Sequence, residues 1–269
     1  MNPRSIACVL VPFALLLACA SEPVPATCEP EVVTPAQPED PLLAAYLHGL
    51  AIAQYPTPER ASDQLLVLEP GNAQLTWDAA GRLLVTTWTR AEYFSDPKYQ
   101  PGHAFDLYGQ TWFSTGTQVH DVCSKSGLQG DALVLRLEQL LGMPPGRGYD
   151  VFMQVWIDPQ QLFRPCAEPS VLEPTCPVAA PLHSEMDQVT WDCSAPSDGH
   201  SQWLCNNWVQ SYGSLDPLGR FPWTALGYTY DWSPENPTGE GPSEFVAPAK
   251  TPVVFERLVP TEEFCKPAA

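Results

Sequence analysis

The sequence predicts an α+β fold with a mainly antiparallel sheet, about two helices and disulfide bonds that brace the domain. Three observations lead to this fold class. Apolar residues recur at helical spacing in two segments, several other segments have the composition of strands, and the second half of the chain is rich in loops and cysteines. Elements of this kind pack as mixed layers around one core.

Two segments carry the start and stop signals of helices. Asp40 and Pro41 suit the N-cap and the first helical position, and Pro56 stops the segment that follows. A second helix is predicted to begin at Asp131 and to end where Gly142 provides a C-cap before two prolines. The apolar faces of these helices consist of Leu43, Tyr46, Leu47, Leu50 and Ala53, and of Leu133, Val134, Leu137, Leu140 and Leu141.

Strands are predicted between turn residues. Asp78 and Gly81 bound a turn that predicts a hairpin between the segments on either side. Residues 149–157 place apolar side chains on both faces, so we expect that strand to be buried on both sides. After Pro165 we expect mainly loops, with disulfides supplying rigidity. The predicted strands are 74–77, 82–88, 105–114, 149–157 and 251–259.

The first eighteen residues have the parts of an export signal. Arg4 is their only charge, and residues 6–17 form an apolar run. Such a run suits the hydrophobic part of a signal peptide and is too short to span a bilayer. No later segment is comparably apolar, so we expect no transmembrane helix in the mature protein.

Leu16-Leu17-Ala18-Cys19 resembles the lipobox of bacterial lipoproteins. The resemblance implies cleavage before Cys19, a diacylglycerol on its sulfur and usually an N-acyl chain such as palmitate. Two or three acyl chains hold a protein stably on a membrane. Ala20 implies sorting to the outer membrane in bacteria that have one. Ala18-Cys19-Ala20 also satisfies the pattern of ordinary signal cleavage, which is the alternative and would release the protein.

The predicted signal peptide and lipidation site divide the chain into three parts. Residues 1–18 are the signal peptide, residues 19–39 are the lipidated cysteine with a tether rich in Pro and Glu, and residues 40–269 form a single α+β domain. The formal charge of the whole chain is −18, and removing Arg4 with the signal makes it −19. Such an acidic protein is repelled by nucleic acid, so we expect no nucleic-acid partner.

Seven cysteines remain after Cys8 leaves with the signal and Cys19 takes lipid. In an exported chain they indicate disulfides, and six of them can pair in about fifteen ways. Short loops close at low entropic cost, which suggests two local pairs and one long-range pair, with Cys28 left in the tether. The suggested pairs are Cys166 with Cys176, Cys193 with Cys205, and Cys123 with Cys265.

Aromatic residues are dense near the C-terminus, and they give one hypothesis for a binding surface. Aromatic rings stack on sugars or pack into protein partners, and nearby carboxylates such as Asp231 can orient a ligand. The alternative is that these rings form the core of a loop-rich region. The candidate residues are Trp203, Trp208, Trp223, Tyr228, Tyr230, Asp231 and Trp232.

We therefore expect a membrane-anchored lipoprotein that binds a protein or glycan of the cell envelope or has a structural role there. The alternative is an exported hydrolase that uses acids such as Asp231 and Glu244, or the region of His120. No catalytic motif supports an enzyme, and we expect no metal and no cofactor. Residues 162–166 and 222–232 also resemble strings from uncharacterised exported bacterial proteins, and this resemblance implies no activity.

Overall fold

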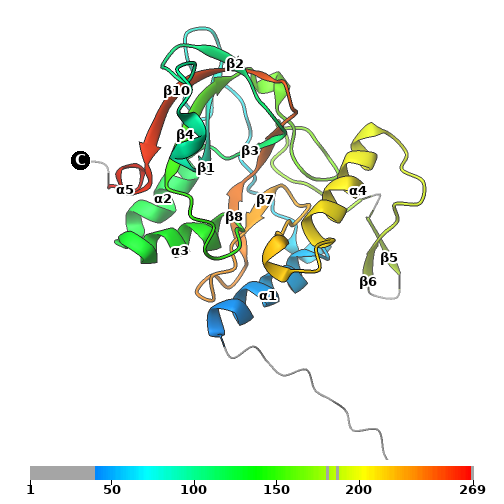
Figure 1. Cartoon of the computed structure of the whole chain (residues 1–269). Coiled ribbons are helices and arrows are strands. Elements are labelled where there is room, and N and C mark those ends of the chain that lie inside the picture. The colour runs from blue at the N-terminus through cyan, green and yellow to red at the C-terminus, as the bar shows by residue number, and fades with distance from the viewer. Residues whose placement is uncertain (1–39, 180–181, 186–187, 268–269) are drawn as a thin grey trace, which may run out of the picture. The chain divides into compact units, whose positions relative to one another are not determined.

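The computed structural model describes residues 40–179, 182–185 and 188–267, with no description of side chains between 180 and 190. Its centre is a four-stranded antiparallel sheet with the strand order β1-β4-β10-β2 (Figure 1). The described part of the chain contains no helix long and apolar enough to cross a membrane. The strands of the sheet are β1 (Leu83–Thr89), β4 (Val151–Ile157), β10 (Pro252–Pro260) and β2 (Ala104–Asp106).

The central position of β4 follows from its composition. Six of its seven residues are buried, as the apolar residues on both of its faces predicted. It pairs with β1 along the whole length of both strands and with β10 on its other side. The register of β10 shifts between Phe255 and Arg257, where an extra residue interrupts the ladder.

Helices cover one face of this sheet. They are α2 (Gly116–Ser126), α3 (Gly130–Leu140) and the short α5 (Thr261–Phe264). Figure 1 shows the three helices together beside the sheet. Trp88, Phe152 and Val259 project from the strands into an apolar cluster with residues of these helices.

The opposite face of the sheet packs against a second, smaller sheet. This sheet pairs β3 (Thr111–Phe113) with β9 (Phe245–Ala247). Leu83 and Val85 of β1 meet Phe113 and Phe245 there, in the largest apolar cluster of the domain. Backbone hydrogen bonds in both directions between Thr86 and Ser114 join β3 to the edge of β1.

The remaining elements surround this core. α1 (Pro41–Ala53) begins as predicted, because the Asp40 side chain accepts a hydrogen bond from the Leu42 amide and Pro41 occupies the first turn. α1 packs on Tyr212, Tyr230 and Trp232. The others are α4 (Gly199–Tyr212), the hairpins β5 (Leu182–Glu185) with β6 (Gln188–Trp191) and β7 (Tyr228–Tyr230) with β8 (Glu240–Ser243), and the 3-10 turns Pro58–Arg60, Ala91–Phe94, Pro159–Gln161 and Pro217–Gly219.

Three disulfides brace the domain, so the α+β fold class with disulfides is confirmed. Their pairs are the ones that loop closure suggested: Cys123–Cys265, Cys166–Cys176 and Cys193–Cys205. The first ties α2 to the end of the chain, and the other two close short loops. Cys19 and Cys28 lie outside the described residues.

Four local predictions were wrong. Residues 74–77 form no strand, and only an isolated bridge joins Trp77 to Leu83. Residues 105–114 do not form one strand, because the chain leaves β2 at Leu107 and turns before it joins β9 as β3. His120 and Cys123 lie on α2, a helix that the sequence did not predict. Only Val119 and Cys123 of that helix are buried, so its apolar signal is short. Residues 199–212 form α4 where a loop was expected, with Asp198 as N-cap.

Candidate functional site

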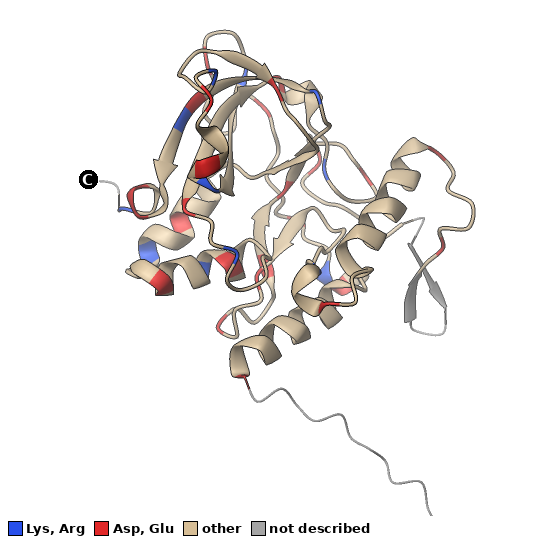
Figure 2. Ribbon diagram, viewed as in Figure 1, with Lys and Arg blue, Asp and Glu red and all other residues tan. Residues whose placement is uncertain are grey.

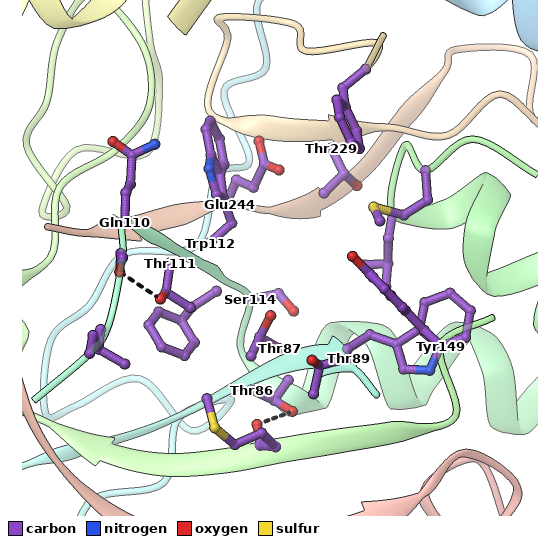
Figure 3. Close-up of a pocket in the computed structure, with 18 of the residues that line it drawn as sticks. Thr86, Thr87, Thr89, Gln110, Thr111, Trp112, Ser114, Tyr149, Thr229 and Glu244 are labelled. Atoms are coloured by element: carbon purple, nitrogen blue, oxygen red, sulfur yellow. Dashed lines mark hydrogen bonds between the residues drawn. The ribbon is translucent and has the colours of Figure 1, made fainter. Parts of the chain in front are cut away.

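A cavity of about 810 Å³ opens beside the end of β1. Its wall comes from β1, β3, the loop after α3, the C-terminal half of α4 and the residue between β8 and β9. Figure 3 shows side chains from these elements around an open centre. Cavities that hold small molecules in proteins have volumes of about 300–1,000 Å³, so this one is of a suitable size for a ligand.

Strand β1 supplies part of the polar surface of the cavity. Alternate residues of a strand share a face, so Leu83, Val85, Thr87 and Thr89 project to the same side of β1. The first two belong to the core, and the two threonines line the cavity. The inward face of β1 therefore changes from apolar to hydroxyl-bearing where the core ends and the cavity begins.

Glu244 enters the cavity from the smaller sheet. Phe113 pairs with Phe245, so the continued register places Glu244 opposite Ser114 and on the same face as Trp112. Figure 3 shows the Glu244 carboxyl beside the Trp112 ring and directed into the open centre. A hydrogen bond from its amide to the Gly227 carbonyl oxygen (2.9 Å) holds the backbone in place.

The Glu244 carboxyl has no hydrogen-bond or ion-pair partner among the described residues. Its side chain is partly exposed, but the surrounding protein displaces most of the water, and burial raises the pKa of the carboxyl from 4.5 to about 8. At neutral pH the group is therefore mostly protonated, and it can donate one hydrogen bond as well as accept others.

Hydroxyl groups line other parts of the cavity wall. Figure 3 places Thr87, Thr89 and Ser114 along one side and the Tyr149 hydroxyl on another. None of these four hydroxyls bonds to another described residue. The hydroxyl of Thr229 differs, because it donates to the Leu140 carbonyl oxygen at 2.6 Å. The cavity thus presents several polar groups whose hydrogen-bonding capacity the protein does not use.

Aromatic rings form much of the rest of the wall. They surround the polar groups with apolar faces that can hold the body of an organic molecule. Two further lining residues, Asn207 and Trp223, each carry a buried N–H donor without a partner in the described structure. The aromatic residues of the wall include Phe94, Tyr99, Trp112, Tyr149, Phe221 and Tyr230.

The chemistry available in the cavity is limited. Neither histidine nor cysteine is among the lining residues, and the second carboxylate, Asp106, is exposed at the rim. None of the hydroxyls in the described wall forms a hydrogen bond with the Glu244 carboxyl, so the wall shows no nucleophile paired with a base. No group of three or more His, Cys, Asp or Glu residues elsewhere in the described structure is arranged to hold a metal ion.

The six aromatic residues singled out in the sequence do not come together as one exposed surface. Trp223, Tyr228, Tyr230 and Trp232 are buried, with at most 7% of each exposed. Trp203 and Trp208 are partly buried on α4 and pack against other rings. Most of this aromatic density therefore serves packing, although Trp223 and Tyr230 also line the cavity.

Asp231 has a structural role in the folded domain. Its carboxylate accepts two hydrogen bonds from Arg136 of α3, at 3.0 and 2.7 Å, and others from the Ser233 amide and the Asn236 side chain. The side chain is 1% exposed. Four donors occupy the carboxylate, so Asp231 has little capacity left for a ligand.

The region of His120 offers no nucleophilic arrangement. The His120 Nε2 lies 2.9 Å from the Lys266 carbonyl oxygen, and its ring meets Phe264 edge-on. These contacts fasten α2 to the end of the chain beside the Cys123–Cys265 disulfide. The side chains of residues 183–185, which also combine His, Ser and Glu, lie outside the described residues.

Sequence reasoning named Glu244 as one acid among several, and it missed the hydroxyl-bearing side of the cavity. One signal for that side is present on β1, where the alternation of apolar residues at 83 and 85 continues as threonine at 87 and 89. Tyr149 carries no comparable signal, because it reaches the cavity from a loop. Comparisons of the chain with protein-family models, curated proteins and solved structures found no match.

Proposed function

We propose that this protein is a lipid-anchored binding protein of the bacterial outer membrane that captures a small organic molecule in the cavity beside Glu244. The observation that carries the proposal is the cavity itself, whose aromatic wall surrounds a carboxyl and hydroxyls without protein partners. Unused buried polar groups cost folding free energy, and a ligand that bonds to them recovers part of that cost.

The lipobox and the tether support the proposed location. An anchor at Cys19 would leave the domain from residue 40 onward free to meet solutes near the membrane. The lining residues lack a nucleophile and base in hydrogen-bond contact, which favours binding over the alternative of hydrolysis. The ligand class therefore includes envelope saccharides and small metabolites with an apolar part.

The test is a ligand screen on the full chain by thermal unfolding, followed through tryptophan fluorescence. A ligand at a hundred times its dissociation constant stabilises the folded state by about 2.7 kcal/mol, which raises the melting temperature of a domain of this size by about 5–11 °C. The panel holds peptidoglycan fragments, simple sugars and aromatic metabolites. No shift with any of them contradicts the proposal.

Two variants then locate the site. Thr89→Phe places a large ring in the cavity and should abolish the ligand-induced shift. Thr175→Phe is the matched control, because Thr175 is exposed and does not line the cavity. A shift that survives Thr89→Phe would place the ligand elsewhere on the molecule.

A further inference from the structure

We infer that the ligand carries an ammonium group, which pairs with the Glu244 carboxylate while the aromatic wall holds its organic part. This inference rests on the proposed function and narrows it to one chemical class. It starts from the charges around Glu244. A carboxyl enclosed by protein needs a cation to hold it in its ionised form, and the described residues provide none.

Basic side chains that contact the cavity wall do not pair with Glu244. Arg90 lies over the Tyr149 ring and Arg147 over the Phe221 ring. Lys98 stands exposed at the rim, 3.8 Å from Asp96, with its ammonium over the Tyr99 ring. Arg60 donates to the Ile52 carbonyl oxygen at 2.6 Å and lies over the Tyr230 ring. The cation that Glu244 lacks can therefore come from a ligand.

The other groups around Glu244 suit an organic ammonium ion. Its three N–H donors can bond to the Glu244 carboxylate and to hydroxyls of the cavity wall. Aromatic faces attract cations, and Trp112 and Tyr149 stand on either side of the opening. An alcohol or a sugar would find the same hydroxyls but would leave Glu244 in its protonated, uncharged form.

The charge of the whole protein favours the same ligand. Thirty-one acidic residues against thirteen Lys and Arg give a formal charge of −18. Figure 2 marks acidic residues on many segments of the described ribbon and fewer basic residues. A negative field of this kind raises the local concentration of cations and speeds their encounter with the protein.

Glu244 is an ionisable group of the cavity whose raised pKa lies near neutral pH. Burial raises the pKa of its carboxyl to about 8, and it also raises the pKa of Tyr212, which lies behind the wall and stays neutral at that pH. Tyrosines ordinarily lose their proton near pH 10. The other ionisable groups lining the cavity are Tyr93, Lys98, Tyr99, Asp106, Tyr149 and Tyr230, with Tyr108 exposed at the rim.

The experiment is a calorimetric titration of the full chain with 2-phenylethylammonium, and with uncharged 2-phenylethanol as the matched probe. Titrations at pH 7 in two buffers of different ionisation enthalpy count the protons released on binding. Because Glu244 is mostly protonated before binding, the ammonium probe should release about 0.9 proton. Its affinity should rise about tenfold per pH unit from pH 6 and level off near pH 8.

Glu244→Gln should weaken binding of the ammonium probe at least tenfold and remove the proton release. Glu235→Gln, the same change on an exposed loop, should leave both unchanged. If 2-phenylethanol binds as tightly as the ammonium probe, the ammonium inference is overturned while binding by the cavity stands. Failure of both probes to bind also overturns it, and the wider ligand screen then decides the proposed function separately. If Glu244→Gln does not fold, the proton count on the unmodified protein remains decisive.

Discussion

Replacing Glu244 by Gln should stabilise the folded protein, and the gain should depend on pH. The native state keeps a proton on Glu244 up to about pH 8, whereas the unfolded chain releases it near pH 4.5. Between these values the unfolded state binds fewer protons than the native state. The free energy of unfolding of the natural protein therefore falls as pH rises through this window.

The magnitude follows from the two pKa values, 4.5 and about 8. Each pH unit inside the window lowers the free energy of unfolding of the natural protein by about 1.4 kcal/mol. At pH 7 this loss of stability therefore reaches about 3 kcal/mol. Glutamine has a similar shape and does not titrate. The stability of Glu244→Gln minus that of the natural protein should therefore be about 3 kcal/mol larger at pH 7 than at pH 4.5.

Urea unfolding at the two pH values, followed by tryptophan fluorescence, measures this difference. Groups that titrate in both proteins contribute equally to the two stabilities, so their contributions cancel in the difference. Any effect of the glutamine amide that does not depend on pH cancels when the two pH values are compared. Glu235→Gln is the control, since it makes the same chemical change at an exposed carboxyl. The reasoning is refuted if the difference between Glu244→Gln and the natural protein is the same at both pH values within about 0.5 kcal/mol.

Three other predictions concern the scaffold. The Cys123–Cys265 bond has a sequence separation of 142, so its loss through paired Cys→Ala changes should cost about 5 kcal/mol. The bonds with separations of 10 and 12 should cost about 3 kcal/mol each, and urea unfolding that ranks the three differently contradicts this account. Asp231→Asn leaves the Arg136 guanidinium without its ion pair and should cost about 3–5 kcal/mol in the same assay; unchanged stability is the opposing result. Gly227→Ala places a Cβ 2.7 Å from the Arg164 side chain at a φ of +83° and should cost more than about 2 kcal/mol. Gly146→Ala, at a similar φ of +79° with open space around it, should cost only about 1 kcal/mol, and equal losses for the two variants would argue against the close contact.

The parts of the fold that sequence predicts are those with local causes. Asp40 and Pro41 set the start of α1 through a hydrogen bond two residues away. The apolar residues on both faces of β4, interrupted only by Gln154, favour a central strand that is covered on both sides. The disulfide pairs follow from chain closure, because two of them are short and the third is the pair that remains.

The parts that sequence does not predict depend on tertiary contacts. Thr115, the N-cap of α2, makes no side-chain capping bond, and the helix owes its place to the buried face at Val119 and Cys123. The cavity is harder to predict from the sequence than α2, because its polar residues are far apart along the chain. Thr87 and Thr89 precede Glu244 by about 150 residues. Nothing in the residues around Glu244 distinguishes it from Glu235 or Glu240 until the register of β3 with β9 is known.

The Cys123–Cys265 bond also makes a covalent ring of more than half of the chain. Glu244, Tyr149 and α4 lie on the ring, whereas β1 and β3 lie outside it. A protease that cuts the exposed loop 234–238 therefore opens the ring without releasing a fragment. Nicked molecules should migrate as one species until a reductant separates the pieces. A protein of this design can survive a single cut with both sides of its cavity still joined.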